Sequence, residues 1–280
     1  MIAEGQAVAV TGATGRVGSR LLPPLLAAGR TVLAISRRPR ADGPGRVRWL
    51  RAEVAAGWPE EAEVARDPLR GPARRARRGP RASAAAAPCA DWLRCPRSAP
   101  ACARVPRTPQ EVRQAARLLA AESALAAWCR ERGVSLCVVR ATAIYDDEDL
   151  GALEPLLRIA ARLRILPLPW PARGLRQPVH AGDLAALLLA LLGHAHEGVI
   201  EAGGGERLDF ATMLRRAARA RVGRCLPLPL PTALLALLAP RWRGAVARLA
   251  RDQVAEPAPV LAELGWCPRP FAPPSRRPAP

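Results

Sequence analysis

Short apolar runs alternate with stretches of helical periodicity along much of this chain. The runs QAVAVT (residues 6–11) and TVLAIS (residues 31–36) are continuously apolar or small, which is typical of strands buried on both faces of a parallel sheet. Between them, apolar residues recur at helical spacing at Leu21, Leu22, Leu25 and Leu26. This strand–helix–strand order predicts an α/β fold. Because Pro23 and Pro24 lie within the helical stretch, we expect a kink or an early end of the helix there.

Two later stretches have the same helical period. The first predicts a helix from apolar positions at Val112, Ala115, Ala116, Leu119, Ala126 and Trp128. The second is the run LAALLLALLG, which begins at Leu184. Asp183 directly precedes this run, so we predict that its carboxylate is the N-cap of the second helix.

A segment in the first half of the chain breaks the pattern. Residues 66–107 contain eleven Arg, eleven Ala and seven Pro but a single Val, so no run within them supports a strand. This composition is typical of disordered chains. Out-of-frame translation of a GC-rich gene also produces Arg, Ala, Pro and Gly, and a genuine basic insertion is the third alternative. Translating the other two frames of the coding DNA would distinguish a frame-shifted stretch from an insertion.

Three glycines follow the first apolar run and precede the first helix. Gly12, Gly15 and Gly18 have the spacing of a dinucleotide-binding turn, where they allow a tight turn, close approach of a pyrophosphate, and close packing of helix on strand. Arg37 and Arg38 follow the second strand, where an acidic residue would bind the ribose of NAD and an arginine suits the 2′-phosphate of NADP. The pattern therefore predicts NADP, with NAD as the alternative because arginine is abundant throughout the chain.

The string TGATGRVG at residues 11–18 resembles the TGxTGxxG signature of extended and atypical short-chain dehydrogenases/reductases, the NAD-dependent epimerase/dehydratase family. RQPVHAGDLA, at residues 176–185, resembles a second element of that family. The resemblance covers about residues 6–58 and 110–273. It implies cofactor contacts from the glycine turn and from the ends of the next two strands, at Thr11, Gly12, Thr14, Gly15, Arg16, Val17, Gly18, Arg37, Arg38 and Glu53.

The same resemblance implies a Rossmann-type, doubly wound parallel sheet with a small C-terminal substrate-side region. We expect residues 1–150 to form the dinucleotide-binding domain, which would include the anomalous segment 66–107. Residues 151–273 would form a mixed substrate-side region to which Rossmann elements return. The proline-rich end of the chain, from Pro268, predicts a loosely ordered tail that is disordered over residues 274–280.

The catalytic Tyr-x-x-x-Lys pair of the family is absent from this sequence. Alignment on Glu122 places Gln114 and Leu118 at the Tyr and Lys positions, and the chain contains no lysine. Because that lysine lowers the pKa of the tyrosine for proton transfer, we do not expect the standard reductase mechanism. Tyr145, the only tyrosine, is expected in the loop after the next strand and is a candidate substitute acid. The resemblance places Tyr145 and His180 at the substrate pocket, with packing and structural roles as the alternatives.

Charge and cysteine usage limit the partners and the compartment. The 43 basic residues, all arginine, outnumber 24 acidic ones, but they are scattered and aromatic residues are few, which argues against a nucleic-acid-binding protein. Seven cysteines without a C-x-x-C pair favour a reducing cytoplasm. No metal site is predicted, because His194 and His196 lack a third ligand. The apolar, arginine-flanked residues 226–251 are a candidate for docking on a membrane surface or a partner protein, and no transmembrane segment is expected.

These observations leave three functions open. The first is an NAD(P)-binding oxidoreductase or epimerase-like protein without the standard catalytic pair, acting on an unidentified small molecule. The second is a non-catalytic sensor or assembly protein that binds NADP. The third is a frame-damaged member of the family. Binding of NADPH separates the first two from the third, and turnover of carbonyl or sugar-nucleotide substrates separates an enzyme from a sensor.

Overall fold

The computed structural model describes nine stretches of the chain and gives no placement for the residues between them. The described residues are 7–37, 45–51, 83–86, 109–131, 135–194, 196–234, 249, 251–256 and 258–275. The chain divides into two compact units. Unit 1 comprises Met1–Trp92, Ala115–Arg140 and Leu184–Ile200, and unit 2 comprises Leu93–Gln114, Ala141–Asp183 and Glu201–Pro280.

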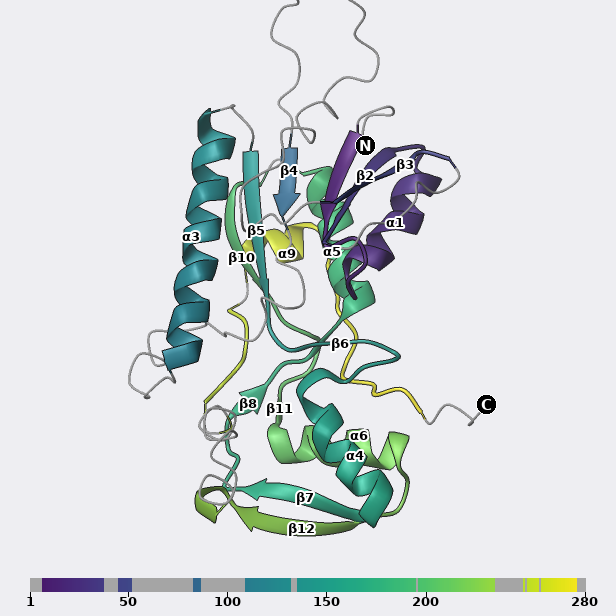
Figure 1. Cartoon of the computed structure of the whole chain (residues 1–280), viewed down its shortest axis with the longest axis vertical. Coiled ribbons are helices and arrows are strands. Elements are labelled where there is room, and N and C mark those ends of the chain that lie inside the picture. Colours follow the sequence, from purple (N-terminus) through teal and green to yellow (C-terminus); the bar gives the residue numbers. More distant parts are fainter. Residues whose placement is uncertain are drawn as a thin grey trace, which may run out of the picture. The chain divides into compact units, whose positions relative to one another are not determined.

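The N-terminal part of unit 1 is a parallel three-stranded sheet, β1-β2-β3 (Figure 1). Strands β1 (Ala7–Thr11) and β2 (Thr31–Ser36) lie where the apolar runs predict them, and β3 (Val47–Arg51) is the next strand that the family resemblance implies. Five of the six residues of β2 are buried, as expected for a strand covered on both faces. The sequence prediction of this half of the fold is confirmed.

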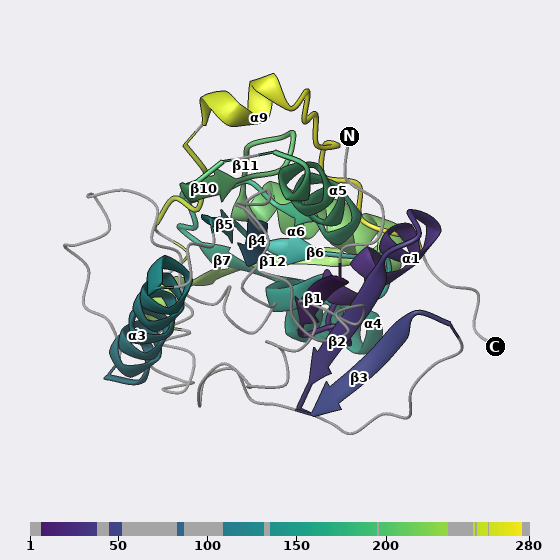
Figure 2. The ribbon, with the colours of Figure 1, turned by 90° about the horizontal axis from the view of Figure 1, so that it is seen from above.

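Helix α1 (Gly18–Ala27) joins β1 to β2 and packs on both strands (Figure 2). Leu21 and Leu25 are its buried anchors. The expected early end of this helix is wrong, because the helix continues through Pro23 and Pro24. Each proline removes one backbone N–H, but the carbonyl of Pro24 still accepts from the N–H of Ala28 (3.0 Å). Burial of the leucines therefore outweighs the two lost hydrogen bonds.

A second three-stranded sheet in unit 1 has the order β10-β5-β4. Its strands are β4 (Ser83–Ala86), β5 (Ser135–Ala141) and β10 (Gly198–Ala202). Strand β4 lies inside the anomalous segment, so the prediction of no strand there is wrong at these four residues. Parallel pairing with β5, from Ser83↔Ser135 to Ala86↔Val138, supplies the hydrogen bonds that the local composition does not predict. The rest of the segment lies outside the described residues.

Helix α3 (Pro109–Glu131) confirms the predicted long helix. It is tied to β5 by an ion pair between Arg140 and Glu122, with 2.7 Å between Nη2 and Oε2. Helix α5 (Ala181–Leu192) confirms the second predicted helix and is buried along Leu184, Leu187, Leu188 and Leu191. None of the described helices has the length and apolar character needed to cross a bilayer.

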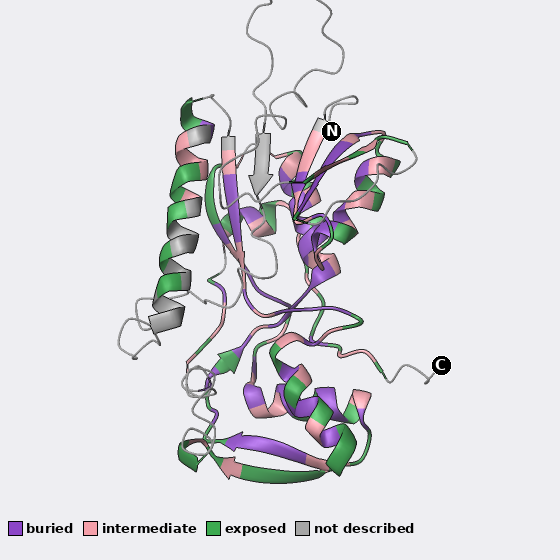
Figure 3. Cartoon of the chain, in the orientation of Figure 1, coloured by how far each residue is buried: buried purple, intermediate pink, exposed green. Residues whose placement is uncertain are grey.

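Unit 2 has its own apolar core between two helices and a two-stranded sheet. Helices α4 (Glu154–Leu163) and α6 (Phe210–Arg221) pack on β7 (Ile165–Trp170), which pairs in parallel with β12 (Leu226–Pro231). Figure 3 shows that β7 is mostly buried whereas β12 is exposed. The candidate docking segment 226–251 therefore begins as an edge strand, and residues 235–248 lie outside the described part.

Shorter elements complete the described chain. They are η4 (Gly151–Leu153), β6 (Ile144–Tyr145), β8 (Leu175–Arg176), β9 (Val179–His180), β11 (Leu208–Asp209) and α9 (Pro259–Glu263). Strand β6 pairs in parallel with β9, and β8 pairs antiparallel with β11.

The C-terminal segment is more ordered than its proline content predicts. Phe271 is 5% exposed and belongs to the core of unit 2. The indole Nε1–H of Trp266 donates to the carbonyl of Asp183 (3.0 Å), and the N–H of Gly205 donates to the carbonyl of Arg269 (3.1 Å). The predicted loose order is therefore wrong for residues 269–272, because tertiary contacts hold a segment that has no regular secondary structure. Residues 276–280 lie outside the described part.

Candidate functional site

The glycine turn in unit 1 follows β1 directly. Gly12 has a φ of 60°, a left-handed conformation that glycine adopts without strain. Its carbonyl accepts a hydrogen bond from the N–H of Gly15 at 2.7 Å, which closes a tight turn between β1 and α1. The turn therefore has the conformation that the first glycine of a dinucleotide-binding motif provides.

The third glycine allows the start of α1 to pack against this turn. A Cβ on Gly18 would lie 2.3 Å from the carbonyl oxygen of Gly12 and 2.8 Å from the Cα of Ala13. A Cβ on Gly15 would lie 3.1 Å from the same oxygen, which is tight but less severe. Of these two glycines, Gly18 is thus the one where the geometry excludes any side chain.

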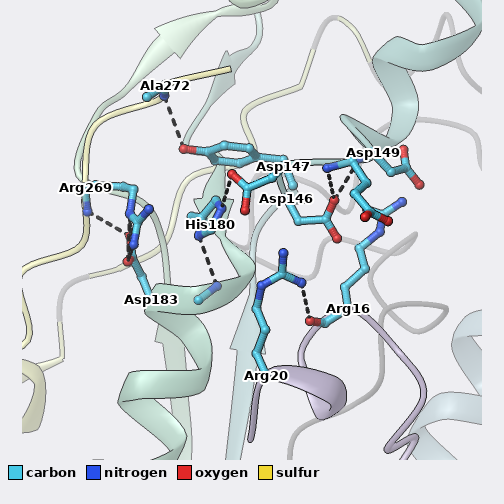
Figure 4. Close-up of polar contacts among 12 residues, drawn as sticks. Arg16, Arg20, Asp146, Asp147, Asp149, His180, Asp183, Arg269 and Ala272 are labelled. Atoms are coloured by element: carbon cyan, nitrogen blue, oxygen red, sulfur yellow. Dashed lines mark hydrogen bonds and ion pairs between the residues drawn. The ribbon is translucent and has the colours of Figure 1, made fainter. Parts of the chain in front are cut away.

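The N-terminal end of α1 has the electrostatic properties of an anion site. Val17 stands at the N-cap without a side-chain hydrogen bond, and the first turn holds no acidic residue. The N–H groups of Ser19 and Arg20 donate to the carbonyls of Gly15 (2.9 Å) and Val17 (3.0 Å), so the attraction for an anion comes from the helix dipole, which makes this end positive. Arg16 and Arg20 add basic side chains, and Nη1 of Arg20 donates to the carbonyl of Arg16 at 2.9 Å (Figure 4). A phosphate would complement this arrangement.

The other predicted cofactor residues divide into two groups. Thr11, Thr14 and Val17 belong to the same turn, and Thr14 is exposed. Arg37 directly follows β2 and is exposed. Because β1 and β2 are parallel, with Thr11 opposite Ile35, Arg37 lies at the same edge of the sheet as the glycine turn. Arg38 and Glu53 lie outside the described residues.

The sequence of α3 contains neither a tyrosine nor a lysine. Gln114 and Leu118 lie on this helix as the alignment predicts, although their side chains are among those that the structure does not describe. Neither side chain type can perform the acid–base step. Glu122, which anchored the alignment, pairs with Arg140 rather than facing a lysine.

Tyr145 lies in unit 2, in strand β6 rather than in the predicted loop, because pairing with β9 extends the backbone there. Only 2% of the residue is exposed. Its hydroxyl accepts from the N–H of Ala272 (3.2 Å) and lies 3.4 Å from the carbonyl of Pro270, to which it donates. Its ring makes edge contacts with His180 and Phe271, with centroid separations of 5.2 and 5.0 Å. These contacts are typical of a packed structural phenol.

The environment of Tyr145 also opposes its ionisation. Burial raises the pKa of Tyr145, and this outweighs the lowering of the pKa by the Ala272 N–H and by Arg269; Asp183 and Asp147 raise the pKa further. A tyrosine that serves a reductase needs the opposite shift. The geometry therefore gives no support to the prediction that Tyr145 is a substitute acid.

A direct titration tests this environment, because Tyr145 is the only tyrosine. We expect the near-ultraviolet absorbance of the phenolate to appear only above the ordinary pKa of 10.0 in the folded protein, and at the ordinary value in urea. Since the folded chain holds this proton more tightly, the stability it contributes is present below pH 10.0 and is lost as the pH rises through the raised pKa. Tyr145→Phe is the blank. A native midpoint at or below 10.0 would contradict the described burial.

His180 is the second buried polar residue at this place, 6% exposed and opposite Tyr145 in the β6–β9 pair. Its Nδ1 accepts from the N–H of Gly182 at 3.1 Å. Its Nε2 lies 3.5 Å from Oδ1 of Asp147 and makes no hydrogen bond with any described residue (Figure 4). Sequence reasoning found His180 but missed Asp147, whose only signal is its place in the acidic run DDED after Tyr145.

Asp183 is not the N-cap of α5, because the helix begins two residues earlier, at Ala181. Its carboxylate instead accepts from the backbone N–H of Arg269 (2.9 Å) and forms an ion pair with that guanidinium (2.8 Å). Asp183 therefore holds the C-terminal segment, whose Pro270 and Ala272 contact the Tyr145 hydroxyl (Figure 4). The sequence shows no signal for this long-range contact. Within the described residues, no group of three or more His, Cys, Asp or Glu side chains could hold a metal ion.

No protein-family model and no curated protein sequence matches this chain. Many solved structures do match it in fold. MoeE5 in complex with UDP-glucose and NAD has a TM-score of 0.57 at 18% identity, over 95% of this chain and 94% of that chain. The human epimerase family protein SDR39U1 with NADPH has a TM-score of 0.57 at 20% identity, over 93% and 94%.

The UDP-glucose 4-epimerase of Thermus thermophilus, a complex with NAD, has a TM-score of 0.59 at 18% identity, over 94% of each chain. At such identities the similarity establishes the fold. It agrees with the parallel β1-β2-β3 sheet and with the glycine turn that leads from β1 into α1. This chain therefore has the Rossmann-type α/β fold of nucleotide-binding epimerases and dehydratases.

Proposed function

We propose that the protein binds NADP(H) at the glycine turn of unit 1, in the manner of epimerase/dehydratase-type short-chain dehydrogenases/reductases. The observation that carries the proposal is the absence of space for a side chain at Gly18, together with the uncapped start of α1. Close packing at this point brings the positive end of the helix dipole to the edge of the sheet, where it would attract a pyrophosphate. Neighbours of the same fold are complexes with NAD or NADPH, which supports this assignment.

The proposed preference for NADP over NAD rests on Arg37. This side chain follows β2 at the edge that holds the glycine turn, where the adenosine ribose of a dinucleotide lies in Rossmann folds. A guanidinium binds a 2′-phosphate through charge-assisted hydrogen bonds, which the 2′-hydroxyl of NAD does not offer. NAD remains the alternative cofactor.

The proposal does not include the family's tyrosine-dependent proton transfer. The chain has no lysine, and the hydroxyl of Tyr145 is engaged by Ala272 and Pro270. A non-catalytic NADP sensor or assembly protein is therefore the second candidate function, and the buried state of Tyr145 favours it. The described cysteines are all unpaired, at Cys129, Cys137, Cys225 and Cys267, which supports our proposal of a reducing, cytoplasmic location.

Titration of the purified protein with NADPH and NADH, followed by nicotinamide fluorescence, tests the cofactor proposal. We expect NADPH to bind more tightly than NADH. Arg37→Ala should weaken NADPH binding about tenfold, because a charge-assisted hydrogen bond is lost. The same substitution should leave the affinity for NADH almost unchanged. Arg48→Ala, which removes an exposed arginine from β3, is the matched control.

If neither NADPH nor NADH binds, the proposed function is contradicted. Equal loss of NADPH and NADH affinity in Arg37→Ala would contradict the NADP preference alone. Once binding is established, turnover of UDP-glucose or of carbonyl compounds with NADP or NADPH separates the two candidate functions. A rate indistinguishable from that without protein would favour the sensor, and a measurable rate would favour the enzyme.

A further inference from the structure

His180 holds a buried hydrogen-bond donor that the described chain does not satisfy. The residue is 6% exposed, and its Nε2 has no hydrogen-bond partner among the described side chains and backbone groups. Leaving a buried polar group unpaired is costly, so such a group points to a ligand or a water. The histidine lies in β9, directly before α5, and its ring stands edge-on to Tyr145.

The hydrogen bonds of the ring decide which nitrogen carries the proton. Nδ1 accepts from the backbone N–H of Gly182 at 3.1 Å, so Nδ1 presents its lone pair. In the neutral imidazole the proton then belongs to Nε2, which acts as a donor. The backbone of α5 thus fixes both the ring orientation and the direction in which His180 donates.

Asp147 supplies an acceptor beside this donor. Its Oδ1 is 3.5 Å from Nε2 of His180, and its side chain is 71% exposed, so a ligand can reach the carboxylate. A carboxylate has about four acceptor positions, so it can accept from a ligand in addition to its contacts within the protein. The other polar groups packed here are committed elsewhere, since the Tyr145 hydroxyl bonds to Pro270 and Ala272, and Arg269 pairs with Asp183.

We propose that His180 and Asp147 together bind an uncharged hydroxyl group of the ligand. A hydroxyl can accept from Nε2–H and donate to the Asp147 carboxylate at the same time, whereas a carbonyl only accepts. A carboxylate or phosphate at this point would be repelled by Asp147. The inference rests on the proposed function, since it assigns a substrate-recognition role within the same protein, and it makes the pair a specificity determinant for hydroxylated ligands.

The test measures binding of UDP-glucose and of UDP to the NADPH-saturated, full-length protein by calorimetry. UDP-glucose offers sugar hydroxyls that UDP lacks, so the wild type should bind it more tightly. We expect His180→Phe and Asp147→Ala each to weaken binding of UDP-glucose about tenfold, because each variant loses one hydrogen bond to the sugar hydroxyl. Binding of UDP should be unchanged in both variants. Because both residues contact one hydroxyl, the double variant should lose little more than either single variant.

Glu263→Ala removes another exposed carboxylate of unit 2, and His196→Phe replaces another histidine; neither should change binding of either probe. Thermal melting shows whether His180→Phe folds. If it does not fold, binding of UDP-glucose by Asp147→Ala decides, because this substitution is at an exposed side chain. The proposal is overturned if the wild type binds UDP-glucose no more tightly than UDP, if either variant weakens both probes equally, or if the two losses simply add. NADPH binding is measured alongside, so a failure of the cofactor proposal is seen separately from a failure of this one.

Discussion

Gly18→Ala is expected to weaken NADPH binding about a hundredfold, or about 2.7 kcal/mol. The single added Cβ would lie 2.3 Å from the carbonyl oxygen of Gly12, so either the turn or the start of α1 must move. A displaced helix start no longer directs the positive end of its dipole at the pyrophosphate. Alanine also favours helix more than glycine does, so the thermal midpoint should fall less than the affinity suggests.

The measurement is NADPH fluorescence with thermal melting of the same samples. Ser19→Ala is the matched control, because Ser19 is the next residue, is exposed, and donates only a long hydrogen bond to Arg16 (3.5 Å). If Gly18→Ala binds NADPH like the wild type, the glycine turn is not the cofactor site. The buried packing at Gly18 would then serve the fold alone.

Gly204→Ala is expected to lower the stability of unit 2 by about 3 kcal/mol, which corresponds to a midpoint lower by roughly 6–12 °C. A Cβ there would lie 1.8 Å from the carbonyl oxygen of Pro178, and backbone cannot give way as a flexible side chain can. The neighbouring Gly205 is equally restricted, with 2.2 Å to the carbonyl of Pro268. Gly204 and Gly205 therefore allow this turn to pack closely against the backbone of Pro178 and of Pro268.

Circular dichroism during heating measures this effect. Gly223→Ala is the control in the same unit, because its φ of 84° imposes backbone strain but nothing lies within 4 Å of its Cβ. Its cost should be about 1 kcal/mol. If Gly204→Ala melts with or above Gly223→Ala, the close packing of this run does not limit the stability of unit 2.

Part of the candidate site is determined by the local sequence, and part depends on contacts between distant residues. The glycine turn could be predicted because all its determinants lie within eight consecutive residues, from Thr11 to Gly18. The approach of Asp147 to His180, and the hydrogen bond between Ala272 and the Tyr145 hydroxyl, depend on residues far apart in the sequence. No periodicity or spacing marks such contacts, because they arise from strand pairing and from the path of the C-terminal segment.

Secondary structure shows where local preference was overruled. The two prolines of α1 and the alanines of β4 contradict their local propensities, because buried leucines and a neighbouring strand supply free energy that the local sequence does not encode. Likewise, Asp183 has the sequence context of an N-cap but binds Arg269 instead. Continuous apolar runs and glycine spacing by themselves determined the strands β1 and β2, the turn between β1 and α1, and the α/β class, since these depend on burial and backbone conformation within a short stretch. Only the tertiary structure decided which polar groups meet at His180 and how the C-terminal segment is held, because those contacts require the whole chain to be folded.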